Sequence, residues 1–383
     1  MRSTTNGYPI LAVVLALGAS IVAAEDKPDY VPKPGEFPPP DSGHYFAGEL
    51  VMVDPINRRG GIRLDGDEIE NKYDKADPLL FAMLPYGALW HHGAPAELCD
   101  IPIGTHVHGY FFLPPEGDKS IPPPKGHRPD YVPKQNHAIL LEDDFSFYQR
   151  RGRGWKVESV DRDAGKLHLV STGPAEGDGL TGKKTLEIDR STRVWRGREL
   201  AEWEAIATGQ DVQVSLTWAP NWVARQFHCA DIWLDQESRD RATERQRQLH
   251  LRYQRNHWLA GWVDHVEHEG LSRGAVTLTL FGGMDPTLYD EVRAKAKSTA
   301  FAVAVGENTL RTYNHSDDAR RGPVLEIKEN ENPPLGSSGI QLRIQMGMLL
   351  EGYRPGRIVR VCPNDWPRVK LPPEQRVTSR LDP

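Results

Sequence analysis

Residues 81–113 read FAMLPYGALWHHGAPAELCDIPIGTHVHGYFFL, and residues 186–218 read LEIDRSTRVWRGRELAEWEAIATGQDVQVSLTW. The second stretch follows the first at an offset of 105 residues, and no gap is needed to align them. The matching pairs are Phe81 with Leu186, Met83 with Ile188, Trp90 with Trp195, Gly104 with Gly209, and Val107 with Val212. A pattern that recurs at a fixed interval is typical of a structural unit used more than once. We therefore expect a duplicated small domain.

A third copy fits if a long insertion is allowed within it. Its first three places are taken by Phe301, Val303 and Leu310, and its last two by Gly356 and Val359. We therefore expect three tandem units, in which Trp90, Trp195 and Leu310 occupy equivalent places.

Within each unit the apolar residues alternate with polar ones, which favours β-strands with one face in water. Residues 211–218 alternate throughout, and residues 156–170 read as a hairpin with an Asp/Gly turn at 161–165. Units of about 70 to 110 residues with several short strands and few helices are typical of small closed barrels, which have no exposed edges. The expected fold is mainly β.

Residues 234–255 are the exception to this alternation, because they contain no Gly or Pro and are dense in good helix formers. Asp235 or Ser238 can cap the start of such a helix. The sequence predicts a connector helix over 233–255, between the second and third units, with Leu234, Leu249 and Tyr253 anchoring its ends. The triplet Tyr-Gln-Arg at 148–150 recurs at 253–255, so residues 139–150 are expected to form a shorter version of this connector.

Proline-rich segments, which disfavour both helices and central strands, complete the expected domain organisation. The predicted segments are a signal peptide at 1–24, linkers at 25–43 and 115–137, barrel units at 44–114, 138–232 and 256–366 (the last with an insertion), the connector helix at 233–255, and a tail at 367–383.

The first residues resemble a targeting segment. A basic start at Arg2 precedes an apolar run from Pro9, which ends in small residues before Glu25. This order is typical of a secretory signal peptide, and Gly18 and Ser20 interrupt the run, which is short for a bilayer span. We expect an exported protein, periplasmic or extracellular, with no transmembrane segment after cleavage.

The composition gives no reason to expect nucleic acid as a partner. The formal net charge is −6 and the pI is about 6.2, so the chain has no overall basic character. Three cysteines, Cys99, Cys229 and Cys362, allow at most one disulfide, so packed apolar cores must supply the stability.

Hairpins, a Val-x-Val strand after a Gly, and tandem copies behind a signal peptide resemble secreted bacterial families of OB-like barrels that have no assigned function. The resemblance covers about two-thirds of the chain. It implies the barrel fold and transfers no functional residue.

A cluster of imidazoles and a thiol lies in the first unit: His91, His92, Cys99, His106 and His108. These side chains are the usual ligands of zinc and copper. His106 and His108 stand two residues apart on a strand and point the same way, about 7 Å apart at Cα. A metal site would require further ligands from His91, His92 and Cys99.

The repeat favours a different role for this strand. If Val107 points into the barrel as Val212 does, then His106, His108, Tyr110 and Phe112 line its outer face. This stripe packs against a neighbouring unit or linker, holds zinc or copper, or binds an organic ligand through Tyr110 and Phe112. We favour packing, with no resident cofactor.

The sequence contains no G-x-S-x-G, S-x-x-K or H-E-x-x-H motif. We therefore predict a non-catalytic exported protein of the cell envelope, with a binding or scaffolding role toward an extended polymer or a protein partner. The alternatives are a periplasmic metal-binding protein and a hydrolase that depends on carboxylate pairs, with Asp143 and Asp144, or Asp65 and Asp67, as the acidic groupings.

Overall fold

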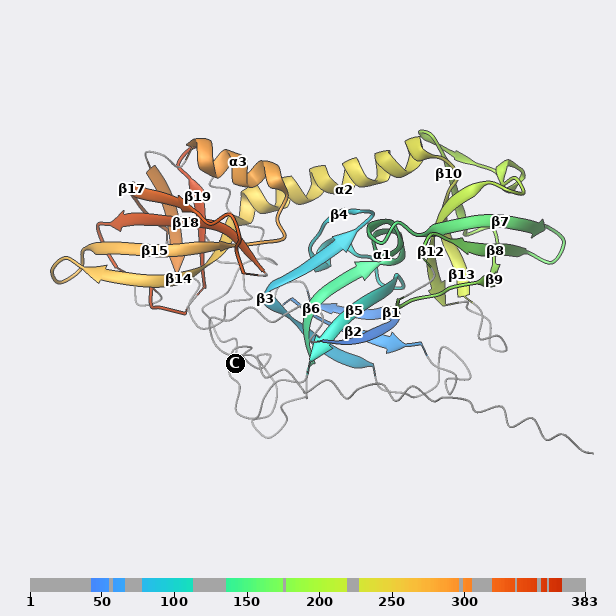
Figure 1. Cartoon of the computed structure of the whole chain (residues 1–383), viewed down its shortest axis with the longest axis horizontal. Helices are drawn as coiled ribbons and strands as arrows, with labels where there is room; N and C mark the ends of the chain where they lie inside the picture. The colour runs from blue at the N-terminus through green and yellow to red at the C-terminus, as the bar shows by residue number, and fades with distance from the viewer. Residues whose placement is uncertain are drawn as a thin grey trace, which may run out of the picture.

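A computed structural model describes residues 43–54, 58–65, 78–112, 136–174, 177–218, 227–295, 299–304, 319–334, 336–349, 353–356 and 358–366. The predicted signal peptide, both proline-rich linkers and the C-terminal tail lie outside these residues, except for Gly43, Asn136 and His137. The protein is mainly β, with three β-sheet bodies in a row and a long helix running along one side of them (Figure 1). None of the helices in the described part of the chain has the length and apolar character needed to cross a membrane.

Barrel 1 is built from the strands β1 (His44–Asp54), β2 (Arg59–Leu64), β3 (Leu79–His91), β5 (His106–Phe112) and β6 (Asn136–Asp143). Their pairings form a closed cycle in the order β1-β2-β3-β6-β5, in which only β3 and β6 run parallel. The two-residue β4 (Ala94–Pro95) turns back on the end of β3. The core holds Leu50, Phe81, Val107, Phe111 and Leu141, so the inward face of β5 is the one that the alternation predicts.

Barrel 2 is built from β7 (Gly154–Asp161), β8 (Lys166–Thr172), β9 (Lys183–Glu187), β12 (Asp211–Trp218) and β13 (Phe227–Trp233). They pair in the same cyclic order as barrel 1, again with one parallel pair, β9 and β13. After β9, β10 (Arg193–Arg196) continues parallel to β13 and turns into β11 (Glu199–Ala201).

The stretches that match in sequence occupy matching places in these two barrels. Trp90 lies opposite Glu142 in the parallel β3–β6 pair, and Trp195 lies opposite Trp233 in the parallel β10–β13 pair. The short 3-10 turns at Leu98–Asp100 and Trp203–Ala205, and the starts of β5 and β12, are each 105 residues apart.

Barrel 3 has a different strand order. It consists of β14 (Leu259–His268), β15 (Gly274–Phe281), β16 (Thr299–Ala304), β17 (Ala319–Glu329), β18 (Ser337–Met346) and β19 (Ile358–Pro363), with α3 (Pro286–Lys295) between β15 and β16. It closes in the order β14-β15-β18-β17-β16-β19 with every pair antiparallel. The expected equivalence of the third unit is therefore wrong for strand order, because alternating apolar residues occur in strands of any topology. Leu310 lies outside the described residues.

The predicted boundary between the first two units is also wrong. Residues 136–143 form β6, which pairs with β3 and β5 and completes barrel 1. Barrel 2 begins at Gly154, after the short helix α1 (Asp144–Arg150). The last strand of barrel 1 is separated from β5 by residues 113–135, so its membership could not be seen from sequence spacing.

The connector helix α2 (Gln236–His257) is continuous, and Asp235 caps it by accepting the Ser238 backbone N–H at 2.8 Å. It runs from barrel 2 to barrel 3 and crosses barrel 1 on the way (Figure 1). Gln246 donates to the Pro95 carbonyl and to Asp100, and Gln254 donates to Glu97. The helix is thus held along its second half by polar contacts with barrel 1. Leu249, which we expected to anchor it, is 42% exposed.

Candidate functional site

The structure separates the predicted metal ligands into two clusters. His106 and His108 lie with Asp144, whereas His91 and His92 lie with Asp143. Cys99 belongs to neither, since its exposed thiol contacts the Asp100 carboxylate at 3.8 Å. The expected combination of all five residues around one ion is therefore not formed. The sequence singled out Asp143 and Asp144 only as an acidic pair, because nothing in their local pattern reveals histidine partners 36 to 52 residues away.

The first cluster is a hydrogen-bond network between the outer face of β5 and the start of α1. Asp144 Oδ1 lies 2.7 Å from His106 Nδ1 and 2.9 Å from His108 Nε2. The remaining ring nitrogens contact Asp65 Oδ2 at 2.8 Å and the Tyr45 hydroxyl at 2.7 Å. Asp144 Oδ2 accepts the backbone N–H of Leu216 in barrel 2 at 2.8 Å. Every nitrogen of both imidazoles has a partner, so neither ring has a free ligand atom. The contact from Asp144 to Leu216 joins the two barrels.

The charges in this network follow from its contacts. Burial alone would lower the pKa of His106, but the carboxylates of Asp144 and Asp65 raise it well above its usual range. His106 faces a carboxylate at each nitrogen and is therefore an imidazolium. Burial lowers the pKa of His108, whose ring accepts from Tyr45 and stays neutral. Burial would raise the pKa of Asp144, yet His106 and His108 hold it below its usual value.

His106, His108 and Tyr110 on the outer face of β5 contact barrel 2 or α1, and packing is one of the alternatives that the sequence left open. The His108 ring stacks on Phe147 of α1 at 3.7 Å between centroids, and Phe147 is part of the core of barrel 2. Tyr110 donates to Asp178 at 2.9 Å, and Phe112 is buried beside Leu84. Neither Tyr110 nor Phe112 lines the cavity beside His91 and His92.

We expect the stability of the protein to fall as the pH rises above about 6.5, through the His106 imidazolium. Because folding raises the pKa of His106, its imidazolium contributes its full stabilisation at pH values below the unfolded-state pKa. This contribution is lost, at up to about 1.4 kcal/mol per pH unit, as the pH rises toward the folded pKa.

Urea unfolding of the wild type and His106→Gln at pH 6.5, 7.5 and 8.5 measures this loss. The stability difference between the two proteins should shrink with pH, whereas a constant difference would show that His106 is neutral. Ring nitrogen NMR shifts of the wild type report the same protonation state if the variant does not fold.

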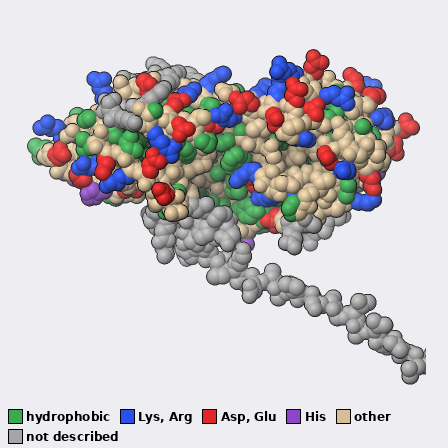
Figure 2. All heavy atoms as spheres, turned by 45° about the horizontal axis from the view of Figure 1, so that its top comes forward, with side chains coloured by type: hydrophobic (Ala, Val, Ile, Leu, Met, Phe, Trp, Pro, Cys, Tyr) green, Lys and Arg blue, Asp and Glu red, His purple; other side chains and the backbone are tan. Residues whose placement is uncertain are grey.

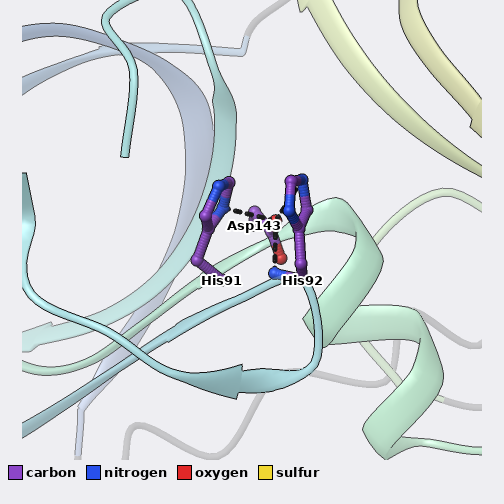
Figure 3. Close-up of side chains that lie close together, drawn as sticks. All are labelled: His91, His92 and Asp143. Atoms are coloured by element: carbon purple, nitrogen blue, oxygen red, sulfur yellow. Dashed lines mark hydrogen bonds and ion pairs between the residues drawn. The ribbon is translucent and has the colours of Figure 1, made fainter. Parts of the chain in front are cut away.

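The second cluster stands at the turn between β3 and β4 (Figure 3). His91 Nδ1 lies 2.7 Å and His92 Nε2 lies 3.9 Å from Asp143 Oδ2, and the two rings stack at 3.8 Å between centroids. Asp143 also caps α1, because its Oδ1 accepts the Ser146 N–H at 2.8 Å. Burial, followed by the neighbouring His91, lowers the pKa of His92 to about 4. The ring of His92 is therefore neutral at pH 7.

His92 adopts a backbone conformation that favours glycine. Its φ is +49°, and the residue 105 positions later, Gly197, has a φ of +53°. Both residues make the same kind of backbone hydrogen bond. The N–H of His92 donates to Asp143, the N-cap of α1, and the N–H of Gly197 donates to Asp235, the N-cap of α2. A left-handed conformation costs a non-glycine residue about 1–2 kcal/mol. Barrel 1 thus carries an imidazole where barrel 2 has the unstrained residue.

Beside His91 and His92 lies the junction cavity, of about 280 Å³, between the β3–β4 turn, β10, β13 and α2. Its walls include Trp195, Trp233 and Leu249. Its charged lining residues are Asp100, Asp231, Arg193, Arg198, Arg241 and Arg245. Figure 2, in which the side bearing α2 is turned forward, shows charged side chains of both signs interspersed with hydrophobic ones.

Most of these charges are already paired. Arg193 makes two hydrogen bonds to Asp231, and Arg198 Nε lies 3.4 Å from Glu237. Arg241 and Arg245 are exposed and one turn apart on α2, and neither forms an ion pair or hydrogen bond with any part of the chain that the structure describes. The cavity therefore presents two unpaired cations beside an aromatic wall.

No protein-family model, curated protein or solved structure is significantly similar to this chain. Its function must therefore be argued from the chemistry of the cavity and the two clusters.

Proposed function

We propose that this protein is a non-catalytic, exported binding protein of the cell envelope, and that its junction cavity takes an anionic group of an acidic polysaccharide. The observation that carries the proposal is the pair Arg241 and Arg245, unpaired among the described residues, in a cavity that Trp195 also lines. Guanidinium groups recognise carboxylates and sulfates through paired N–H donors, and aromatic rings pack on the apolar faces of sugars.

The barrel topology supports a polymer as the ligand. We interpret barrels 1 and 2 as OB-like, and their common strand order at a 105-residue offset as a tandem repeat. OB barrels bind oligosaccharides and oligonucleotides with side chains on their strands and flanking loops. The export prediction, which rests on residues 1–24 outside the described part of the chain, favours the saccharide.

The carboxylates weigh against the hydrolase alternative. Asp143 and Asp144 are both fully buried, and each is already bound by a histidine and a backbone N–H. Asp65 is engaged by His106, and Asp67 lies outside the described residues. Retaining and inverting glycosidases need two carboxyl groups that flank the substrate. We therefore favour binding without catalysis.

Calorimetric titration with a tetramer of galacturonic acid, beside neutral maltotetraose, tests the proposal. The acidic tetramer should bind the wild type, and binding should weaken with added salt. The Arg241→Gln/Arg245→Gln double variant should bind at least about 10-fold more weakly, a change of about 1.4 kcal/mol. The matched control is Arg239→Gln/Arg252→Gln, which removes the same charge from residues of α2 that do not line the cavity. Absence of binding, equal binding of both sugars, or equal loss in both double variants would overturn the proposal.

A further inference from the structure

We propose that His91, His92 and Asp143 form a binding site for one divalent transition-metal ion, zinc or copper, in the wall of the junction cavity. This inference does not depend on the polysaccharide proposal, because it is tested with the metal alone. Imidazole nitrogens with one carboxylate oxygen suit these ions, and three protein ligands leave a coordination position open. Since His91 and His92 both line the cavity, that open position faces it.

The ligand atoms already lie close together. The three side chains each offer an atom within 4.8 Å of the others, and the distances to Asp143 Oδ2 are 2.7 Å from His91 and 3.9 Å from His92. Atoms bonded to one zinc ion at about 2.0–2.2 Å lie roughly 3–3.5 Å apart. The stacked rings differ by 25° with centroids 3.8 Å apart, so their lone pairs lie in nearly parallel planes that do not meet at one ion, and one ring must turn to bind. His92 can turn, because its side chain is 26% exposed whereas that of His91 is 8% exposed.

A second observation concerns the His91–Asp143 contact. His91 Nδ1 is buried and pairs with Asp143 Oδ2 at 2.7 Å, but this contact does not have the alignment of a regular hydrogen bond. A buried polar nitrogen without a well-aligned partner is uncommon in folded proteins and calls for an explanation. An ion bound by both atoms would satisfy them, with their separation widening from 2.7 Å to roughly 3–3.5 Å.

The backbone at His92 supplies a third observation. Gly197 forms the equivalent turn in barrel 2 without a side chain, so the turn itself does not require an imidazole. Strained backbone conformations concentrate at functional sites, where the function of the side chain offsets the conformational free energy. The other cluster offers no comparable site, because all four ring nitrogens of His106 and His108 have partners.

The experiment is a titration of the chelator-treated full-length protein with Zn²⁺ and, separately, with Cu²⁺, followed by calorimetry and elemental analysis. The wild type should bind one ion per chain. His92→Gly should weaken binding at least about 100-fold while the melting temperature stays equal or rises, because glycine relieves the left-handed conformation. His91→Gln should also weaken binding. The matched control is His168→Gln, which removes an imidazole whose ring contacts Thr185 on barrel 2.

The two histidine variants make the outcome decisive. Loss of binding in His92→Gly and His91→Gln, with retention in His168→Gln, supports the site. Fewer than about 0.1 ions per wild-type chain, or full binding in His92→Gly, would overturn it. Zinc binding without galacturonate binding, or the reverse, separates this inference from the proposed function.

Discussion

Replacement of Asp144 by alanine is expected to lower the free energy of unfolding by about 3–5 kcal/mol, because it leaves the His106 imidazolium buried without its closest counter-ion. Asp144 is completely buried and accepts hydrogen bonds from His106, His108 and the backbone of Leu216. Removing one partner of a buried ion pair costs far more than the net value of the pair, since the remaining charge keeps its desolvation penalty.

Urea unfolding at pH 6.5, followed by tryptophan fluorescence, gives this value for Asp144→Ala relative to the wild type. The control is Asp163→Ala, because Asp163 is exposed at the tip of the β7–β8 hairpin. It should change the stability by less than about 0.5 kcal/mol. A loss below about 1 kcal/mol in Asp144→Ala would contradict a charged, buried network. If the variant does not fold at all, the wild-type protonation of His106 described above still tests the network.

Replacement of Phe147 by alanine should cost about 3–5 kcal/mol through the cavity that it leaves. Phe147 belongs to α1 but is fully buried in the core of barrel 2. Its ring stacks on His108 of barrel 1 on one side, and the Arg151 guanidinium lies 3.8 Å from its centre. The truncation therefore removes packing from both barrels.

The Phe147→Leu variant is the matched comparison, because it keeps much of the apolar volume and loses the planar ring. We expect it to recover more than half of the loss in thermal or urea unfolding. Equal losses in the two variants would mean that ring stacking, and not buried volume, dominates at this position.

The strands of the first two barrels could largely be predicted because their alternation is local. The inward side chains of β5 and β12, such as Val107 and Val212, are buried as the period of two indicates. The closure of barrel 1 by β6 could not be predicted, since parallel pairing with β3 joins residues more than 50 positions apart. The apolar matches that suggest a third copy in barrel 3 carry no information on strand order, so they do not predict its different topology.

The buried face of α2 escaped prediction for a related reason. The residues that it buries include Gln246, His250 and Gln254, whereas its apolar Leu249 is exposed. Hydrophobic periodicity identifies the buried face of a helix that packs on an apolar surface. It does not identify the buried face of a helix that is held by hydrogen bonds from amide side chains. The two histidine clusters were missed as separate groups because their division depends on Asp143 and Asp144, whose partners come from distant strands.

Because α2 is attached to all three barrels, its length sets the orientation of barrel 3 relative to barrels 1 and 2. Its start is capped against barrel 2, its second half is bound to barrel 1 through Gln246 and Gln254, and its end leads directly into β14 of barrel 3. Each added residue would advance a helix by about 1.5 Å and turn everything beyond it by roughly 100°. Single insertions or deletions in α2 would therefore swing barrel 3 around the helix axis. An insertion of four residues, close to one whole turn of about 3.6 residues, would mainly shift it outward.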